Sequence, residues 1–203
     1  MVLSMDSIKS NEEYFDQSFN KLQLDSLTIV ACEFEECEFN ECDFSTTTFK
    51  NCKFINCFFR SCNLSLLKVP YTSFFEISFV ECKLVGVDWT KASWPSFNFD
   101  SDLKFSQCIL NDSSFFGLTL NELEFDECKL YDVDFREGNF AHSRMVYCDF
   151  SNSLFMHTNL QCVDFSESCN FNIDVLENRL AKAKFSRYEA LNLLDSLDIE
   201  LVD

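Results

Sequence analysis

Residues 32–44 read CEFEECEFNECDF, and this stretch repeats one short pattern three times. Cys32, Cys37 and Cys42 each begin a unit in which an acidic residue and then a phenylalanine follow. Such a stretch could be a metal site, a disulfide framework or a structural repeat. The choice depends on how far the spacing of five extends along the chain, because an internal repeat decides the whole fold.

The spacing of five extends over most of the chain. Steps of five from Phe19 to Phe99 meet an apolar residue every time. After one extra residue, near Asp100–Asp102, the period resumes at Phe105 and continues to Phe165. All thirty positions are apolar, and they hold 18 of the 25 phenylalanines. This regularity favours the structural repeat.

A period of five fits neither regular secondary structure on its own. Five residues drift about 140° around an α-helix, and in a flat strand successive steps of five alternate between the two faces. The chain must therefore turn once in every pentad. A backbone that turns in the same way every five residues coils into a solenoid whose inward positions stack. The sequence thus predicts an all-β solenoid.

Ten of the twelve cysteines stand two residues before a central apolar residue, at a second inward position. They are Cys32, Cys37, Cys42, Cys52, Cys57, Cys62, Cys82, Cys108, Cys128 and Cys148. Zinc sites favour ligand pairs two to four residues apart, so we expect no metal and no cofactor. We expect buried free thiols, since inward rotamers and a reducing compartment disfavour disulfides. Cys162 and Cys169 fall outside the column and are predicted to be the more reactive pair.

Composition narrows the classes of partner. The 203 residues carry a formal net charge of -18, which argues against nucleic acid and anionic membranes and favours a basic partner. The N-terminal residues lack a basic segment followed by an apolar run, so we expect a cytoplasmic protein. No nucleophile elbow, phosphate-binding loop or histidine-centred constellation is present in the sequence, and a regular solenoid offers no cleft. We therefore expect no enzymatic activity.

The repeats resemble the pentapeptide-repeat motif, in which a small residue, a polar residue, a central Phe or Leu and two polar residues follow one another. CEFEECEFNECDF, CKFINCFFRSCNL (52–64) and CDFSNSLF (148–155) carry the resemblance. It implies a right-handed quadrilateral β-helix with four pentads per coil. The expected organisation is a lead-in at residues 1–17, the β-helix at 18–169 with a one-residue insertion near 100–104, and a helical cap and dimerisation segment at 170–203.

The C-terminal segment DFSESCNFNIDVLENRLAKAKFSRYEALNLLDSLDIELVD (164–203) resembles the ending of pentapeptide-repeat proteins that protect bacterial DNA gyrase. These are the quinolone-resistance Qnr proteins, the mycobacterial fluoroquinolone-resistance protein, and immunity proteins against microcin and albicidin. Ser186 and Glu189 form a capping-box pattern before an apolar stripe at Ala190, Leu191, Leu194 and Leu197, which predicts a short helix. The resemblance implies a homodimer through this end. The residues assigned to the interface and cap are Tyr188, Leu191, Leu194, Leu197, Ile199 and Leu201.

The same resemblance implies a function for the acidic surface. In these proteins the rod is thought to imitate duplex DNA on the basic DNA-binding saddle of gyrase or topoisomerase IV, protecting the enzyme from quinolones or peptide toxins. Eight acidic residues follow a central residue by two and should point outward: Glu36, Glu41, Glu76, Glu81, Asp112, Glu122, Glu127 and Asp132.

Two further expectations concern this acidic surface. With four pentads per coil, Glu41, Glu81 and Glu122 would share one side. The single extra residue also indicates a member without the loops that interrupt some Qnr proteins. The alternative interpretation is a scaffold pentapeptide-repeat protein with another partner, whose charge serves only to keep a rod soluble.

Overall fold

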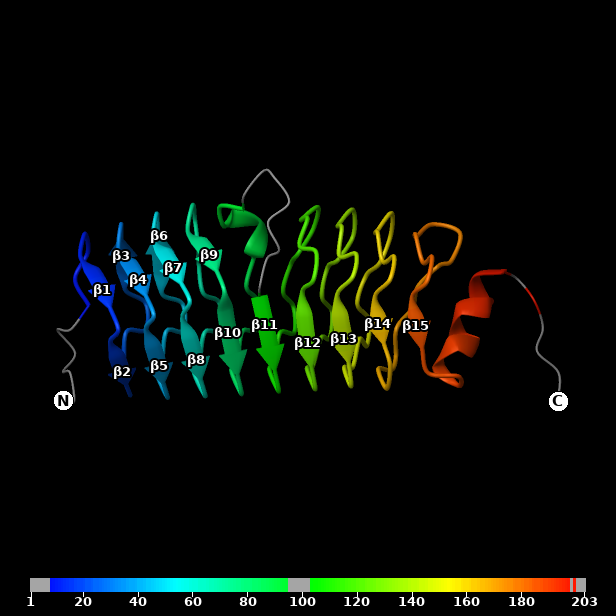
Figure 1. Cartoon of the computed structure of the whole chain (residues 1–203), viewed down its shortest axis with the longest axis horizontal. Coiled ribbons are helices and arrows are strands. Elements are labelled where there is room, and N and C mark those ends of the chain that lie inside the picture. The colour runs from blue at the N-terminus through cyan, green and yellow to red at the C-terminus, as the bar shows by residue number, and fades with distance from the viewer. Residues whose placement is uncertain (1–7, 95–102, 198, 200–203) are drawn as a thin grey trace.

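The computed structural model describes residues 8–94, 103–197 and 199, and it is a parallel β-solenoid of about eight turns (Figure 1). Short strands of two to four residues stack along a rod, and residues on neighbouring coils are generally 20 apart, as in the pair Phe39 and Phe59. Four pentads therefore make one coil, as predicted. Within the described residues, no helix is long and apolar enough to cross a lipid bilayer.

Within the part of the chain that the structure describes, the strands form three sheets. A nine-stranded sheet has the order β15-β14-β13-β12-β11-β10-β8-β5-β2, a four-stranded sheet the order β1-β4-β7-β9, and β3 pairs with β6. The strands are β1 (Glu13–Phe15), β2 (Ser18–Asn20), β3 (Thr28–Val30), β4 (Glu33–Glu35), β5 (Glu38–Asn40), β6 (Thr48–Lys50), β7 (Lys53–Ile55), β8 (Phe58–Arg60), β9 (Ser73–Phe75), β10 (Ile77–Val80), β11 (Leu103–Ser106), β12 (Glu124–Asp126), β13 (Arg144–Val146), β14 (Asp164–Phe165) and β15 (Lys184–Phe185). Isolated parallel bridges such as Asp43 to Asn63 extend the pairing to the remaining side.

The corners of the coil explain the period of five. The second residue after nearly every described central residue has a positive φ, for example 53° at Glu36 and 54° at Glu41, and Lys91 after Trp89 is an exception. This left-handed conformation costs roughly 1–2 kcal/mol for a residue other than glycine. Most corner N–H groups donate to a carbonyl of the next coil, as from Glu36 to Ile55 at 3.0 Å, so the strained turn keeps these donors paired.

The core consists of stacked central residues. The rings of Phe39 and Phe59 lie nearly parallel with centroids 4.6 Å apart, and neighbouring sides meet edge to face, as Phe34 and Phe39 do at 5.5 Å. Both arrangements are favourable for aromatic rings. The ten column cysteines are buried and free, as predicted. The thiol of Cys62 donates to the carbonyl of Phe39 at 3.3 Å.

One coil is longer than the others. Phe79 pairs with Phe105, 26 residues further on, so this coil holds six more residues than its neighbours. Of the six additional residues, five make a whole pentad and leave the period of five unchanged. The sequence pattern therefore showed only one extra residue. The expectation of a one-residue insertion near 100–104 and of a stack without a longer insertion is therefore wrong. Phe99 and Asp100–Asp102 lie outside the described residues.

The solenoid extends past both predicted boundaries of 18–169. At the N-terminal end, β1 begins at Glu13 and pairs with β4. At the C-terminal end, β15 continues the nine-stranded sheet to Phe185. Phe171 and Ile173 fill the core there, out of step with the period of five, so the pattern hid this last coil. Nine stacked strands at the usual ~4.8 Å spacing make a rod roughly 38 Å long.

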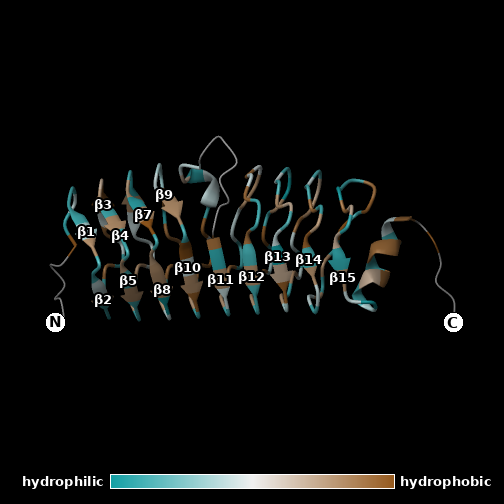
Figure 2. Cartoon of the chain, in the orientation of Figure 1, coloured by the Kyte–Doolittle hydropathy of each residue, from teal (hydrophilic) through white to brown (hydrophobic). Residues whose placement is uncertain are grey.

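Among the described residues there are also two short 3-10 helices. η1 (Trp89–Lys91) is capped by Asp88, whose side chain accepts from the N–H of Thr90. η2 (Glu189–Leu197) is the predicted C-terminal helix, and Figure 2 shows much of it in brown.

The predicted capping box at the start of η2 is wrong. Ser186 Oγ donates to Glu167, and the Glu189 carboxylate accepts from the N–H of Asn170 at 3.3 Å. Both side chains therefore fasten η2 to the preceding coil rather than to each other.

Candidate interaction surface

The corners of the coil carry the predicted acidic residues. All eight are exposed, as predicted from their place two residues after a central residue, and all eight also have a positive φ. They are Glu36, Glu41, Glu76, Glu81, Asp112, Glu122, Glu127 and Asp132. The turn that closes each side of the coil thus also aims these carboxylates into solvent.

Four corner columns run along the rod, numbered here in chain order from the end of the four-stranded sheet. Corner I follows that sheet and contains Glu36, Glu76 and Glu122, and corner II follows the nine-stranded sheet and contains Glu41, Glu81 and Glu127. Asp112 and Asp132 lie on corner III. Corner IV contains Ala31, Asn51, Tyr71, Gly117, Glu137 and His157. None of the eight predicted residues lies on corner IV.

The long coil changes which carboxylates are neighbours. Glu41 and Glu81 share corner II, as expected, but Glu122 lies on corner I. The six additional residues shift the sequence numbers of each corner column by six, so the column of Glu81 continues with Gln107 and then Glu127. Gln107 donates to the Glu127 carboxylate at 2.7 Å, and Ser61 donates to Glu81 at 2.9 Å.

The nine-stranded sheet neutralises much of its own charge. Among the described residues, four ion pairs join successive coils on this sheet or at its corner. They are Lys21 with Glu41 at 3.3 Å, Lys104 with Glu124 at 3.2 Å, Arg144 with Asp126 at 2.7 Å, and Lys184 with Asp164 at 3.0 Å. Each pair links neighbouring coils, so these charges stabilise the stack and are not free to attract a partner.

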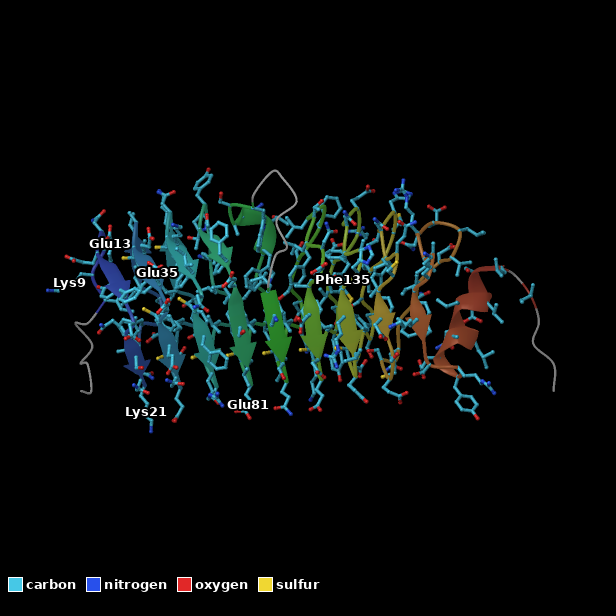
Figure 3. The ribbon with its side chains drawn as sticks, in the orientation of Figure 1. Lys9, Glu13, Lys21, Glu35, Glu81 and Phe135 are labelled. Atoms are coloured by element: carbon cyan, nitrogen blue, oxygen red, sulfur yellow. The ribbon has the colours of Figure 1, made fainter. Side chains whose placement is uncertain are left out.

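The four-stranded sheet differs from the nine-stranded sheet in both the charge and the polarity of its outward side chains. Its outward side chains stack in two registers: Glu13, Glu33, Lys53 and Ser73 in one, and Phe15, Glu35, Ile55 and Phe75 in the other. In Figure 3, Glu13 and Glu35 lie near β1 and β4, away from Lys21 and Glu81 at the lower edge. Phe15 and Phe75 are 60% and 37% exposed.

Sequence reasoning missed these outward apolar residues. It followed inward positions and acidic corners, whereas Phe15, Ile55 and Phe75 recur at multiples of 20 on one outward register. Searching each outward position at a period of 20 would have found them.

Shallow hollows lie along the described part of the rod. One of about 530 Å³ is lined by Leu66, Leu67, Val69, Pro70 and Gly86 together with Thr46, Lys68, Asp88 and Lys91. A smaller one of about 320 Å³ is lined by Asn56, Glu76, Ser78 and Lys104. Across residues 8–94, 103–197 and 199, no group of three His, Cys, Asp or Glu side chains is placed to hold a metal ion.

The C-terminal end carries exposed apolar side chains. Tyr188 is 83% exposed and Ile199 is 51% exposed, while Leu191 and Leu197 are 46% and 41% exposed. Leu194 is half-buried, and Leu193, which the predicted stripe did not include, packs against the core. Leu201 lies outside the described residues.

Family models match the repeats directly. The model of the pentapeptide repeat region matches residues 32–102, and a second model, of eight-copy pentapeptide repeats, matches residues 139–169. The two matches together span about half of the chain. No curated protein sequence matches it.

Solved structures of QnrB1, a plasmid-mediated fluoroquinolone resistance protein, are similar to this fold. One trypsin-treated form gives a TM-score of 0.70 at 19% identity, covering 97% of this chain and 100% of that chain. A second trypsin-treated form gives 0.65 at 20% identity, covering 100% of both chains. The full-length protein gives 0.55 at 19% identity, covering 95% and 100%. At such identity the likeness shows the fold. With its family-model matches, its corners every five residues and its four-sided coils, the chain belongs to the pentapeptide-repeat family.

Proposed function

We propose that this chain is an acidic interaction protein that binds a type II topoisomerase, DNA gyrase or topoisomerase IV, in place of DNA. By occupying the basic DNA-binding saddle, it would protect the enzyme from poisons such as quinolones or peptide toxins. The likeness in fold to QnrB1 over nearly the whole chain supports this proposal. The activity needs no catalysis by this protein, because binding alone excludes the poisoned complex.

The columns of exposed carboxylates are the observation that carries the proposal. Glu36 and Glu76 on corner I and Glu81 and Glu127 on corner II recur two coils apart, on a rod with a formal net charge of -18. A regular acidic rod resembles the charge distribution of a duplex. Electrostatic complementarity with a basic saddle would steer the encounter and make association fast and sensitive to salt.

We further propose that two chains join through their C-terminal ends. Tyr188, Leu191, Leu197 and Ile199 leave apolar surface in water beside η2 in the single chain. Burying this surface against a second copy would recover hydrophobic free energy and double the length of the acidic rod.

The second candidate function is a scaffold with a different partner. The ion pairs of the nine-stranded sheet favour it, because they use acidic residues to bind neighbouring coils together. On that interpretation the remaining charge serves solubility.

Direct binding to purified gyrase over a series of salt concentrations separates the two functions. We expect an affinity that falls steeply as salt rises, since the contact is electrostatic. An absence of binding at low salt would contradict the topoisomerase proposal and leave the scaffold function.

A further inference from the structure

The four-stranded sheet, which belongs to the N-terminal half of the chain, presents acidic and apolar side chains in adjacent columns. We name it the N-terminal strip and define it by eight residues: Glu13, Phe15, Asp16, Glu35, Glu36, Ile55, Phe75 and Glu76. Phe15, Glu35, Ile55 and Phe75 stack in one register, and the corner residues Asp16, Glu36 and Glu76 run beside them. Three coil spacings separate Phe15 from Phe75, or about 14 Å.

No ion pair within the described residues neutralises the carboxylates of the strip. In the described part of the chain, Glu13, Asp16, Glu35, Glu36 and Glu76 make no ion pair. The basic residue on the four strands is Lys53, and its ammonium binds Glu33 at 3.3 Å. Lys9 lies at the N-terminal end of the rod, and its side chain makes no ion pair among the described residues (Figure 3).

This arrangement costs the folded chain stability. Glu13 lies directly opposite Glu33 in the register of β1 and β4, and like charges in that position repel each other. The nine-stranded sheet shows that the same fold can place Lys104 opposite Glu124 instead. Positive charge from outside the chain would relieve the repulsion on the strip.

The phenylalanines specify the kind of positive charge. Phe15 is 60% exposed and lies between Glu13 and Asp16 in the sequence. An arginine guanidinium can pair with a carboxylate and also stack its plane on an aromatic face, which a free metal ion cannot do. Exposed apolar side chains beside carboxylates therefore fit a basic protein surface that also offers apolar contact.

We propose that the N-terminal strip, rather than the nine-stranded sheet, is the docking surface for the partner. The partner surface presents arginine or lysine around an apolar contact. This inference rests on the proposed function and adds to it the side of the rod that meets the topoisomerase. Binding through this side buries Phe15 and Phe75 and pairs the uncompensated carboxylates.

Two matched double variants test the location. Glu36→Lys with Glu76→Lys reverses two charges on corner I, and Glu81→Lys with Glu127→Lys reverses two charges on corner II. Members of each pair lie two coils apart, and the change in net charge is the same. Lysine suits these corners, because Lys21 and Lys182 already occupy corner positions with φ of 54° and 64°.

The measurement is affinity for gyrase and, separately, for a synthetic peptide of arginine and leucine. We expect the corner I double variant to bind gyrase and the peptide at least about tenfold more weakly, because charge reversal turns attraction into repulsion. The corner II double variant should lose far less affinity for either. Equal or greater loss in the corner II pair, for either probe that binds, overturns the inference. If the unmodified chain binds the peptide but not gyrase, the proposed function fails, and the peptide comparison still decides the location.

The apolar part of the strip is tested at high salt, where surface electrostatics are screened. Phe15→Ser with Phe75→Ser is compared with Phe116→Ser, which removes a 46% exposed phenylalanine from another side of the coil. We expect the first variant to lose most of the peptide binding that persists at high salt, and Phe116→Ser to keep it. Equal retention by both variants would overturn the apolar contact.

Discussion

Phe79 and Phe105 stack with ring centroids 5.0 Å apart and planes 6° from parallel, although 26 residues separate them. Trp89 and Phe115 stack across the same coil at 5.8 Å. The six additional residues therefore leave the aromatic column continuous. Stacking of central residues, rather than a fixed coil length, holds this fold together.

A charge placed in this column should unfold the protein. Phe79 is 1% exposed, so Phe79→Asp removes a large apolar contact and buries a carboxylate without a partner. We expect destabilisation of more than about 4 kcal/mol, a large part of the stability of a typical domain. Phe116→Asp, at an exposed site, should change stability by less than about 1 kcal/mol. Thermal melts compare the two, and similar melting temperatures would show that the assigned register is wrong.

Corner positions should discriminate between residue types. Asn56 has a φ of 50°, a conformation that β-branched side chains tolerate poorly. Asn56→Val should destabilise the fold by roughly 1–2 kcal/mol, whereas Asn56→Gly should stay within about 1 kcal/mol of the unmodified protein. Chemical denaturation measures both. Equal stability of the valine and glycine variants would show that the corner is not strained.

His157 should make stability depend on pH. Its Nδ1 lies 2.8 Å from the Glu137 carboxylate and its Nε2 lies 2.9 Å from that of Glu177, and the hydrogen bond to Glu137 raises the His157 pKa above its usual 6.5. A raised pKa stabilises the folded state fully below the unfolded pKa, and this contribution is lost as the pH rises through the folded value.

The comparison for this prediction is His157→Gln. The melting temperature of the unmodified protein should fall relative to that of the variant as the pH is raised from about 6 to above the folded pKa. A difference between the two melting temperatures that does not change with pH would rule out a charged imidazole between the two carboxylates.

The cysteines should react with alkylating agents in two classes. Burial raises the pKa of Cys52 to about 11 and disfavours its thiolate, and the other column cysteines are also buried. Cys162 and Cys169 are half-buried, although desolvation also raises the pKa of Cys169. Mass spectrometry of the native protein treated with iodoacetamide should find Cys162 and Cys169 modified first. Modification of Cys82 or Cys108 at the same rate would contradict the buried column.

The sequence predicts the fold well because its signal is local. The period of five predicts each central apolar residue and each corner, and it does so without any information on which coils are adjacent. The period of 20 is much weaker, because all four sides accept the same apolar residues. The sequence could therefore place Glu122 outward but could not assign it to corner I, and it could not distinguish a slip of one residue from an insertion of six.

Contacts between coils decide what the sequence could not show. Lys21 and Glu41 are 20 residues apart and form a pair only because their coils are adjacent. Glu189 accepts from Asn170 across a coil boundary, where a local capping pattern predicted a partner at Ser186. The unpaired negative charge of the N-terminal strip likewise becomes visible only when each lysine and arginine is assigned to its side of the coil.

The most direct test of the central claim is supercoiling by DNA gyrase in the presence of a poison, with and without this protein. We predict that substoichiometric poison inhibits supercoiling less when the protein is present, for quinolones or for peptide toxins that act on gyrase. The Glu36→Lys and Glu76→Lys double variant should protect less than the Glu81→Lys and Glu127→Lys variant. Unchanged inhibition by several chemically distinct poisons, with a folded protein present, would contradict the account.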